Sequence, residues 1–482
     1  MSVSKPSGVA PNQVLAIVCI GMVLANLDLF IVNVGLPAVA RDLKSANLED
    51  LSWVLNGYAI AYASLLVFFG RLAERHRRDK SFLLGVGVFT VASAACAAAG
   101  SVPMLVAFRI VQAAGAALMT PTSLGLLLAS FPPERRGGAV RTWTAIGGLA
   151  AAIGPLVGGL LIAASWRWIF LVNVPIGLIA IVVGWHRLPA VPGHDIPRPN
   201  PWAALLVTVG VAALTLGIVK GNDWGWASPA IVASFAAAAL SLGLFIRHCL
   251  VSANPFIDPS LFRMRQYTGA TLVMGCYSGA FGAMLLSIVL WEQEAWGWSA
   301  MRTGLAIATG PLLVPITSFL FVGPLIKRFG ASSVIVAGVL CFAAAMIGWA
   351  TLLGTEPSMG LAIAAMAPTG IGVGLTFPTT MGVGTSGLPP SMFATGSGAI
   401  NMIRQSALAI GVAIFVAIVG APHSPAERLA GFQRGWWVLA AIVALALIPT
   451  LVLIRPRKQP APAAAERDRI APSGVEEAPE LP

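Results

Sequence analysis

The sequence predicts an all-α polytopic membrane protein with fourteen transmembrane helices and both termini in the cytoplasm. The composition is the first reason: 57% of the 482 residues are hydrophobic and only 10% are charged, whereas about a quarter of a soluble chain is charged. The second is that apolar residues occur in runs of about 20, the length that a helix needs to cross a hydrocarbon core. The third is the uneven distribution of Lys and Arg between the loops.

Fourteen windows have the length and apolar character of a membrane span. The chain has 51 glycines, which suit close contact between helices in a bilayer, where small residues let backbones approach each other. The windows lie near residues 13–37, 50–70, 81–100, 103–130, 138–163, 168–187, 201–220, 228–249, 267–291, 302–326, 331–354, 358–384, 394–420 and 434–454.

The loop charges predict the orientation. An even number of spans places both termini on one side, and that side carries about three times as many Lys and Arg residues as the other. Because loops rich in these residues stay in the cytoplasm, both termini are expected there, and the protein is expected in the cell (inner or plasma) membrane.

A weak internal repeat predicts how the spans are grouped. The string Gly70-Arg71-Leu72 after the second span matches Gly323-Pro324-Leu325 after the tenth. This match favours two groups of six spans separated by two additional spans (6+2+6), with a cavity between the two six-helix groups. The end of the chain is rich in Pro, Ala and charge and is predicted to be disordered. The expected parts are a cytoplasmic tail (1–12), a six-helix bundle (13–187), two additional helices with their loops (188–266), a second six-helix bundle (267–454) and a cytoplasmic tail (455–482).

Asp28 is the one acidic residue that the span map places deep in hydrocarbon, where a charge is costly and marks a functional candidate. Counted from Pro37 and Pro103 at 1.5 Å per residue, Asp28 and Arg109 lie about 13 and 9 Å from the outer face, so we expect them to meet. Asp28 either binds and releases a proton alternately, with Arg109 favouring its charged form, or forms a permanent ion pair that holds two helices in register.

Three other charged residues receive different interpretations. Arg404, inside the thirteenth span, either attracts an anionic substrate in a water-filled cavity or bonds to helix-end and loop carbonyls near the cytoplasmic side, which we favour. Glu292 and Glu294, at the outer end of the ninth span, are expected to be solvated rim residues that cationic substrates could meet first.

The sequence lacks the patterns of other chemistry. The five cysteines are scattered and suggest no disulfide or thiolate metal site, and the five histidines lack the spacing of a helical zinc site. No Walker-type phosphate loop is present, so ATP is not expected to drive the protein directly. We therefore expect no enzyme activity, cofactor, metal or nucleic-acid partner, and an ion gradient or the substrate's own gradient as the driving force.

Four segments together resemble one transporter family. They are Leu27 to Pro37 (LDLFIVNVGLP) in the first span, Arg109, Gln112 and Gly115 in the fourth, Gly154, Pro155, Gly158 and Gly159 in the fifth, and Trp166 to Gly177 (WRWIFLVNVPIG) at the start of the sixth. These motifs resemble those of the fourteen-helix drug:proton antiporters of the major facilitator superfamily, the EmrB/QacA type. The similarity covers nearly the whole chain apart from the tail.

The resemblance implies the major facilitator fold and an exporter in which two bundles rock around a central cavity, expelling lipophilic molecules or drugs in exchange for protons. It implies that Asp28 and Arg109 take part in proton coupling, and that the fifth-span motif marks an exporter. Members that export divalent cations often carry further acids in the second bundle. Because none is expected inside it here, monovalent, neutral or anionic lipophiles are expected as substrates.

The resemblance also implies a latch on the cytoplasmic side, in the loop after the second span. The loop has Glu where the family has Asp, and Arg77 where it has Gly, so a looser latch is expected. Its residues here are Gly70, Glu74, Arg75 and Arg78. Candidate substrate contacts are aromatic and amide residues, because pockets for lipophiles are apolar with a few polar groups. They are Asn33, Trp53, Tyr58, Gln112, Tyr277 and Phe281.

Two other functions stay open at this point. A proton-coupled or facilitative importer of a small organic solute would use the same bundle and the same pair of charges. A non-transporting membrane receptor would be expected to carry a folded soluble domain, for which the loops are too short. A membrane-fusion protein that carries cargo across an outer envelope is a further partner that the sequence leaves open.

Overall fold

The computed structural model describes residues 10–44, 48–193, 199–388, 392–422 and 424–454, and every regular element within them is helical. The predicted disordered tail and most of the N-terminal tail lie outside these residues. The elements are α1 (Pro11–Asp42), α2 (Leu48–Arg75), α3 (Arg78–Ala97), α4 (Val102–Ser130), α5 (Pro133–Ile162), α6 (Trp168–Leu171), α7 (Asn173–Arg187), α8 (Pro201–Trp224), α9 (Pro229–Val251), η1 (Pro259–Arg263), α10 (Arg265–Leu290), η2 (Trp291–Ala295), α11 (Ala300–Leu320), α12 (Val322–Phe329), α13 (Ala331–Leu352), α14 (Met359–Ser386), α15 (Phe393–Val419), α16 (Pro425–Leu445) and α17 (Leu447–Leu453).

The prediction of an all-α polytopic protein is confirmed. Each predicted window falls on a helix or on consecutive helices. Thirteen candidate spans in the described part of the chain are long and apolar enough to cross a membrane. α5 contributes a shorter apolar stretch, Ile153–Ile162, within its 30 residues. The count of fourteen spans and the side on which the termini lie stay predictions.

Three of the predicted spans are interrupted, and proline explains each interruption. A proline has no N–H to donate to the carbonyl four residues earlier, so a helix tends to end there. α6, α11 and α16 each end at the residue four before a proline, and a further helix then begins. The prolines are Pro175, Pro324 and Pro449.

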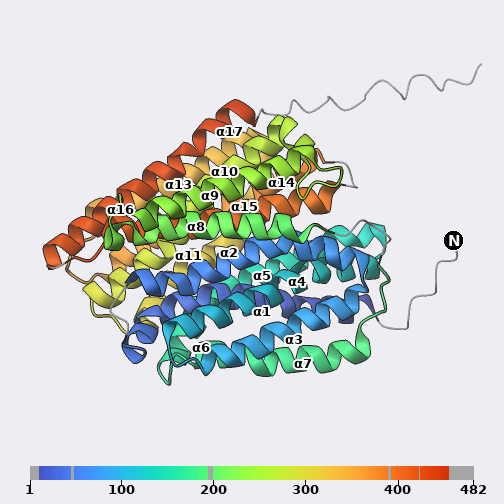
Figure 1. Cartoon of the computed structure of the whole chain (residues 1–482), viewed down its shortest axis with the longest axis horizontal. Helices are drawn as coiled ribbons and strands as arrows, with labels where there is room; N and C mark the ends of the chain where they lie inside the picture. Colours follow the sequence, from blue (N-terminus) through green and yellow to red (C-terminus); the bar gives the residue numbers. More distant parts are fainter. Residues whose placement is uncertain (1–9, 45–47, 194–198, 389–391, 423, 455–482) are drawn as a thin grey trace, which may run out of the picture.

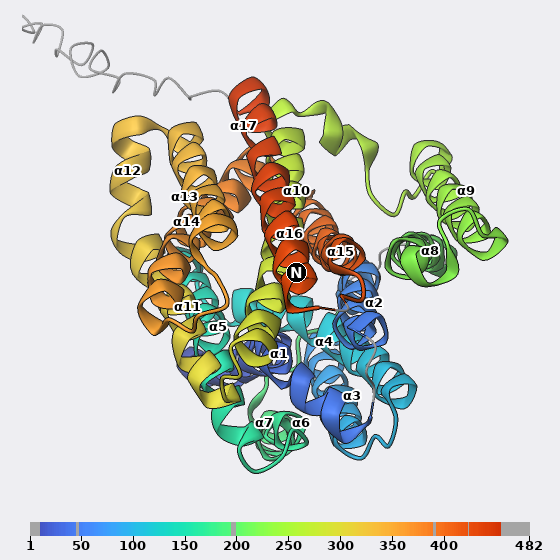
Figure 2. The same ribbon diagram turned by 90° about the vertical axis from the view of Figure 1, so that its left-hand side faces the viewer.

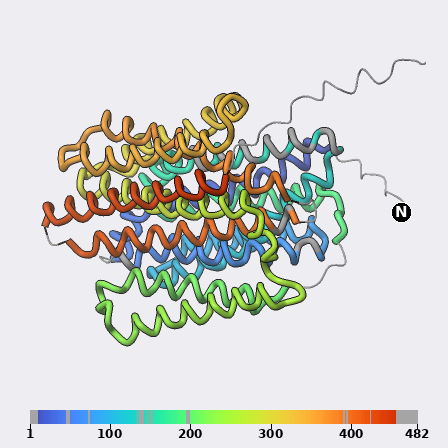
Figure 3. The backbone as a smooth tube through the Cα atoms, turned by 90° about the horizontal axis from the view of Figure 1, so that it is seen from above, coloured from blue at the N-terminus to red at the C-terminus, as the bar shows by residue number. Residues whose placement is uncertain are grey.

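The helices form two halves. α1–α7 form the N-terminal half, in the lower part of Figure 1. α10–α17 form the C-terminal half, which lies mostly in the upper part, with α11 level with α2 and α5. α8 and α9 pack on each other as a pair at the flank, where α8 contacts α2 and α15, and Figures 2 and 3 show this pair at the edge of the molecule. Between the halves, α5 packs on α11 and α2 packs on α15.

We call the end of the molecule where α1 begins and α17 ends the terminal end, and the other the opposite end. The two halves diverge toward the terminal end in Figure 1. At the opposite end their backbones touch: a Cβ added to Gly304 of α11 would lie 2.5 Å from the carbonyl oxygen of Pro155 on α5. One added to Gly159 would lie 2.8 Å from the carbonyl oxygen of Ala300. Glycine at these positions therefore allows the halves to close.

Candidate functional site

A fully buried ion pair between Asp28 of α1 and Arg109 of α4 lies at the centre of the candidate site. The other carboxylate oxygen of Asp28 accepts hydrogen bonds from the amide of Gln112, at 2.8 Å, and from that of Asn173 on α7, at 3.2 Å. All four residues are fully buried. The two charges that the sequence expected to meet do meet, and two amide groups help to satisfy the carboxylate.

Arg109 is held on several sides. Its Nη1 also donates to Oε1 of Gln112 at 2.6 Å, and its Nε donates to the backbone carbonyl of Val54 on α2 at 3.3 Å. The guanidinium lies 4.1 Å above the ring of Tyr58 on α2. Gln112 donates to the hydroxyl of Ser93 on α3 at 2.8 Å. One polar network therefore joins α1, α2, α3, α4 and α7.

This network is sensitive to any change in its charges. A buried ion pair has given up its hydration, so removing one partner leaves an uncompensated charge and costs about 3–5 kcal/mol. Low dielectric also strengthens each hydrogen bond in the network. Two of its atoms, Nη2 of Arg109 and Oδ1 of Asn173, have no hydrogen-bond partner in the described part of the chain. They leave room for an alternative set of bonds.

The segment of residues 166–173 holds α1 at two levels. At the opposite end, Trp166 Nε1 and Arg167 Nη1 donate to Asp42, the last residue of α1, at 2.8 and 2.6 Å. Asn173 contacts Asp28 deeper in the bundle. Pro175 ends α6 and thereby turns the chain between the two contacts. The motif at the start of the sixth predicted span thus positions the charged residue of the first.

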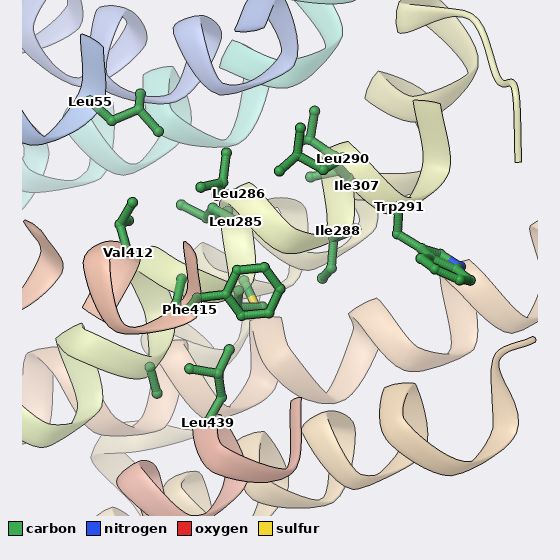
Figure 4. Close-up of a cluster of buried hydrophobic side chains, with 14 of the residues drawn as sticks. Leu55, Leu285, Leu286, Ile288, Leu290, Trp291, Ile307, Val412, Phe415 and Leu439 are labelled. Atoms are coloured by element: carbon green, nitrogen blue, oxygen red, sulfur yellow. The ribbon is translucent and has the colours of Figure 1, made fainter. Parts of the chain in front are cut away.

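A small cavity of about 30 Å³ lies between the two halves, with walls from α1, α2, α10 and α15. This space holds about one water molecule. Figure 4 shows Leu55 of α2, Leu285 of α10 and Val412 of α15, three of the apolar residues that line it. Asn33 and Asn56 are the amide residues of the wall. Neither amide atom of Asn56 has a hydrogen-bond partner in the described structure, although Asn56 is fully buried.

An aromatic chain runs from this cavity into the C-terminal half. Phe281 contacts Phe30 across the halves, with ring centroids 6.1 Å apart, and packs on Phe377 at 5.7 Å. Tyr277 packs on the other side of Phe377 at 5.3 Å and on Phe342 at 4.9 Å. Phe281 and Phe30 line the cavity, whereas Tyr277 is buried behind it.

The predicted substrate contacts therefore separate into three groups. Asn33 and Phe281 line the cavity. Gln112 and Tyr58 surround the ion pair. Trp53 packs with the apolar residues between α2, α8 and α15 and is not among the residues that line the cavity.

The residues of the predicted latch are only partly described. Arg78 begins α3 and packs across α4, where a Cβ on Gly125 would lie 3.1 Å from its Cδ. Gly70 faces Pro121 of α4 at ordinary contact distance. The side chain of Glu74 lies outside the described part. Arg75 ends α2, and its backbone carbonyl passes close to Gly193.

The fifth-span motif packs α5 against both halves. Gly154 and Gly158 face α1 near Phe30 and Ile31, whereas Pro155 and Gly159 face α11. Because a Cβ at Gly158 would already lie 3.0 Å from Ile31, small residues are required along this stripe.

Arg404 of α15 is half-buried and points toward the N-terminal half. Its guanidinium lies 5.8 Å from the centroid of the ring of Phe377 on α14. Its Nε has no hydrogen-bond partner among the described residues. Neither of the two expectations for Arg404 is tested by these contacts.

One prediction about the second half is wrong. Glu292 is fully buried, not a solvated rim residue, because α10 continues through the π-helical turn η2 and carries this side chain inward. Glu294, two residues later in the same turn, is exposed as expected. The C-terminal half therefore does contain a buried acid.

Sequence reasoning missed Ser93, Asn173 and Asn56. A polar residue inside an apolar span was the signal that could have identified all three. Asn173 also lies within the motif at the start of the sixth predicted span. Its partner could not be identified because contacts between helices depend on rotation and tilt, which hydropathy does not specify.

Two helical halves around a small central cavity, with a charged network inside one half, define a membrane transporter. The Major Facilitator Superfamily model matches residues 18–412, and the chain belongs to this superfamily. It is accordingly a multi-pass protein of the plasma membrane and not an enzyme.

The chain is similar to curated resistance and export proteins. It is 30% identical to the tetracenomycin C resistance and export protein of Streptomyces glaucescens, over 86% of this chain and 78% of that protein. It is 32% identical to the methylenomycin A resistance protein of Bacillus subtilis (strain 168), over 93% and 95% of the two chains. A solved structure of a bacterial homologue of the human drug peptide transporters PepT1 and PepT2 has a TM-score of 0.66 at 14% identity, covering 92% of this chain and 98% of that one, and shows the same fold.

Proposed function

We propose that this transporter is a proton-coupled exporter of lipophilic small molecules or drugs that works by alternating access. The observation that carries the proposal is the fully buried network around Asp28, which joins five helices of one half through a single carboxylate. The antibiotic-resistance names of its relatives support export as the direction.

The coupling follows from the hydrogen bonds. An ionised Asp28 attracts Arg109 and accepts from both amides. A proton on Asp28 cancels the charge that holds Arg109 and replaces one acceptor by a donor. Arg109 then has no counter-charge, and Nη2 of Arg109 and Oδ1 of Asn173, which have no partner in the described structure, can take part in new bonds. The five helices must repack, so proton binding and helix packing are linked.

Export requires the cavity to enlarge. At about 30 Å³ it is too small for a drug-sized ligand, which needs about 300–1,000 Å³. We therefore assign this conformation to a state without substrate. When the halves separate, Asn33 and Asn56 provide hydrogen bonds within an otherwise apolar wall. The unpaired amide of Asn56 is then satisfied by the substrate, which favours binding.

The proposal includes the arrangement in the membrane. Both termini face the cytoplasm, residues 13–187 and 267–454 form the moving bundles, and residues 188–266 form a pair of helices at their flank. This pair packs beside α2 and α15, where the halves meet. The terminal end then faces the cytoplasm and the opposite end faces outward.

The test uses inverted vesicles containing wild type, Asp28→Asn, Asp28→Glu or Glu356→Gln. Glu356 is an exposed carboxylate in a loop and serves as the matched control. Uptake of ethidium, a neutral antibiotic and an anionic dye is followed with and without an imposed pH gradient. Wild type and control are expected to accumulate at least one probe as the gradient is applied, and Asp28→Asn is expected to lose uphill accumulation. Unchanged gradient-driven accumulation by Asp28→Asn would refute the coupling role.

A further inference from the structure

Glu292 occupies an unusual position for an acidic residue. It is fully buried in η2, directly after α10 and at the opposite end of the molecule. Neither of its carboxyl oxygens has a hydrogen-bond partner in the described structure. The hydroxyl of Thr303 on α11 is the polar group that lies beside the carboxyl. A carboxylate enclosed in this way would have lost its hydration without any replacement. This enclosure therefore favours the neutral form of the carboxyl in this conformation.

The residues on both sides of Glu292 in the chain belong to aromatic clusters. Trp291 packs on Trp436 and Phe432, and the backbone N–H of Trp298 donates to the carbonyl of Glu292 at 2.9 Å. Trp296 and Trp298 pack on each other with centroids 4.8 Å apart. The carboxyl of Glu292 itself is fully shielded from solvent in this conformation.

The other charged groups near the opposite end interact with residues other than Glu292. Glu294 shares the π-helical turn but is exposed, and the fields of Arg428 on α16 and Arg41 on α1 act on it. Arg302 of α11 stacks on Trp298 at 4.4 Å. None of these groups forms an ion pair with Glu292 in the described structure.

Glu292 also lies where the two halves meet. The next residue, Gln293, donates through its side chain to the backbone carbonyl of Val34 on α1 at 3.1 Å. Thr303 is next to Gly304, whose backbone touches α5 of the N-terminal half. If the halves separate at this end, the contacts on both sides of the carboxyl break and water reaches it.

We propose that Glu292 is a second proton-binding site, in the half that lacks Asp28. It holds its proton while the opposite end is packed and releases the proton when that end opens. This inference rests on the alternating access proposed above but not on the role of Asp28.

The sign of the pH effect follows from the two protonation states. The packed state binds one more proton than the open state, so low pH favours packing and rising pH favours opening. The ratio of packed to open molecules is expected to fall by up to about tenfold per pH unit once Glu292 ionises in the open state.

The experiment measures protonation and opening in nanodiscs without substrate, on full-length wild type, Glu292→Gln and Glu294→Gln. Infrared difference spectra report the carbonyl band of a neutral carboxyl. Amide hydrogen exchange, corrected for its intrinsic pH dependence, reports opening in residues 288–304. Wild type and Glu294→Gln are expected to show the carboxyl band disappearing, and corrected exchange rising at least threefold, from pH 6 to pH 9. Glu292→Gln, which mimics the neutral acid, is expected to lack that band and its exchange is expected to stay low.

Two results would overturn the proposal. One is the same neutral-carboxyl band and the same pH-dependent exchange in Glu292→Gln as in wild type. The other is that neither Glu292→Gln nor Glu292→Met folds, because the site would then require a charge. Since neither measurement uses substrate or Asp28, a failed vesicle assay with Asp28→Asn leaves this test intact.

Discussion

The backbone contact between α5 and α11 provides the sharpest structural prediction. A Cβ at Gly304 would lie 2.5 Å from the carbonyl oxygen of Pro155. Ordinary contacts begin at 3.4 Å, so Gly304→Ala must move the two helices apart by about 1 Å. Backbone atoms cannot rotate away as a flexible side chain can. Overpacking of this kind costs about 1–3 kcal/mol, and the cost falls on the conformation in which the halves touch.

This magnitude can be converted into populations. A change of 1–3 kcal/mol shifts a two-state equilibrium by about 5–150-fold. Gly304→Ala is therefore expected to lower the packed population at the opposite end by that factor. Gly348→Ala on α13 is the matched control, because a Cβ there meets no atom within 4 Å.

The assay is a distance measurement between spin labels on the two halves. Ala164 and Glu356 are exposed, lie at the opposite end, and can be replaced by cysteine after removal of the five native cysteines. Pulsed electron resonance in nanodiscs is expected to show a longer-distance population in Gly304→Ala and none in Gly348→Ala. If Gly304→Ala keeps the distance distribution of the control, the close contact does not limit the packing of the halves.

Three other substitutions test separate parts of the site. Arg109→Lys keeps the charge but loses the planar group that contacts Asp28, Gln112 and Val54 together. It is expected to lower the free energy of unfolding by about 2 kcal/mol, within the range for hydrogen bonds to charged groups. It is also expected to abolish gradient-driven uptake in vesicles. Asn56→Leu removes an unpaired buried amide that costs about 1–3 kcal/mol, so the melting temperature is expected to rise. KM for a transported probe is expected to rise as well, because the amide no longer binds substrate. A fall in both quantities would contradict the role of Asn56 in substrate binding. Asp42→Asn breaks an exposed pair with Arg167 and should leave uptake close to wild type at physiological salt, as screened surface pairs contribute little.

The sequence predicted the helical architecture well because apolar runs and prolines act locally. Each predicted window contains helix, and the depth estimate brought Asp28 and Arg109 together although 81 positions separate them. The same estimate could not identify Asn173 as a hydrogen-bond partner of Asp28. Its contact depends on the break after α6, which turns the chain between Trp166 and Asn173.

Glu292 shows where hydropathy fails. A glutamate at the end of an apolar run is typical of a solvated rim, and Glu294 follows that rule. The π-helical turn changes the rotation of the chain at this point and directs Glu292 inward. At 100° per residue the two acids lie about 160° apart around the helix, so periodicity separates their faces, but hydropathy alone does not show that the protein still encloses the helix at this level.

Helix α1 connects Asp28, the proposed protonation site, to the contact between the two halves. At 100° per residue, Asp28 and Asn33 lie about 140° apart around the helix, so Asp28 faces the network of its own half while Asn33 faces the cavity. Val34, one residue further, accepts the hydrogen bond from Gln293 of the other half. A shift of α1 that follows a change of charge at Asp28 therefore reaches the cavity wall and the contact between the halves at once. Because a helix is rigid over six residues, no longer chain of contacts is needed to couple them.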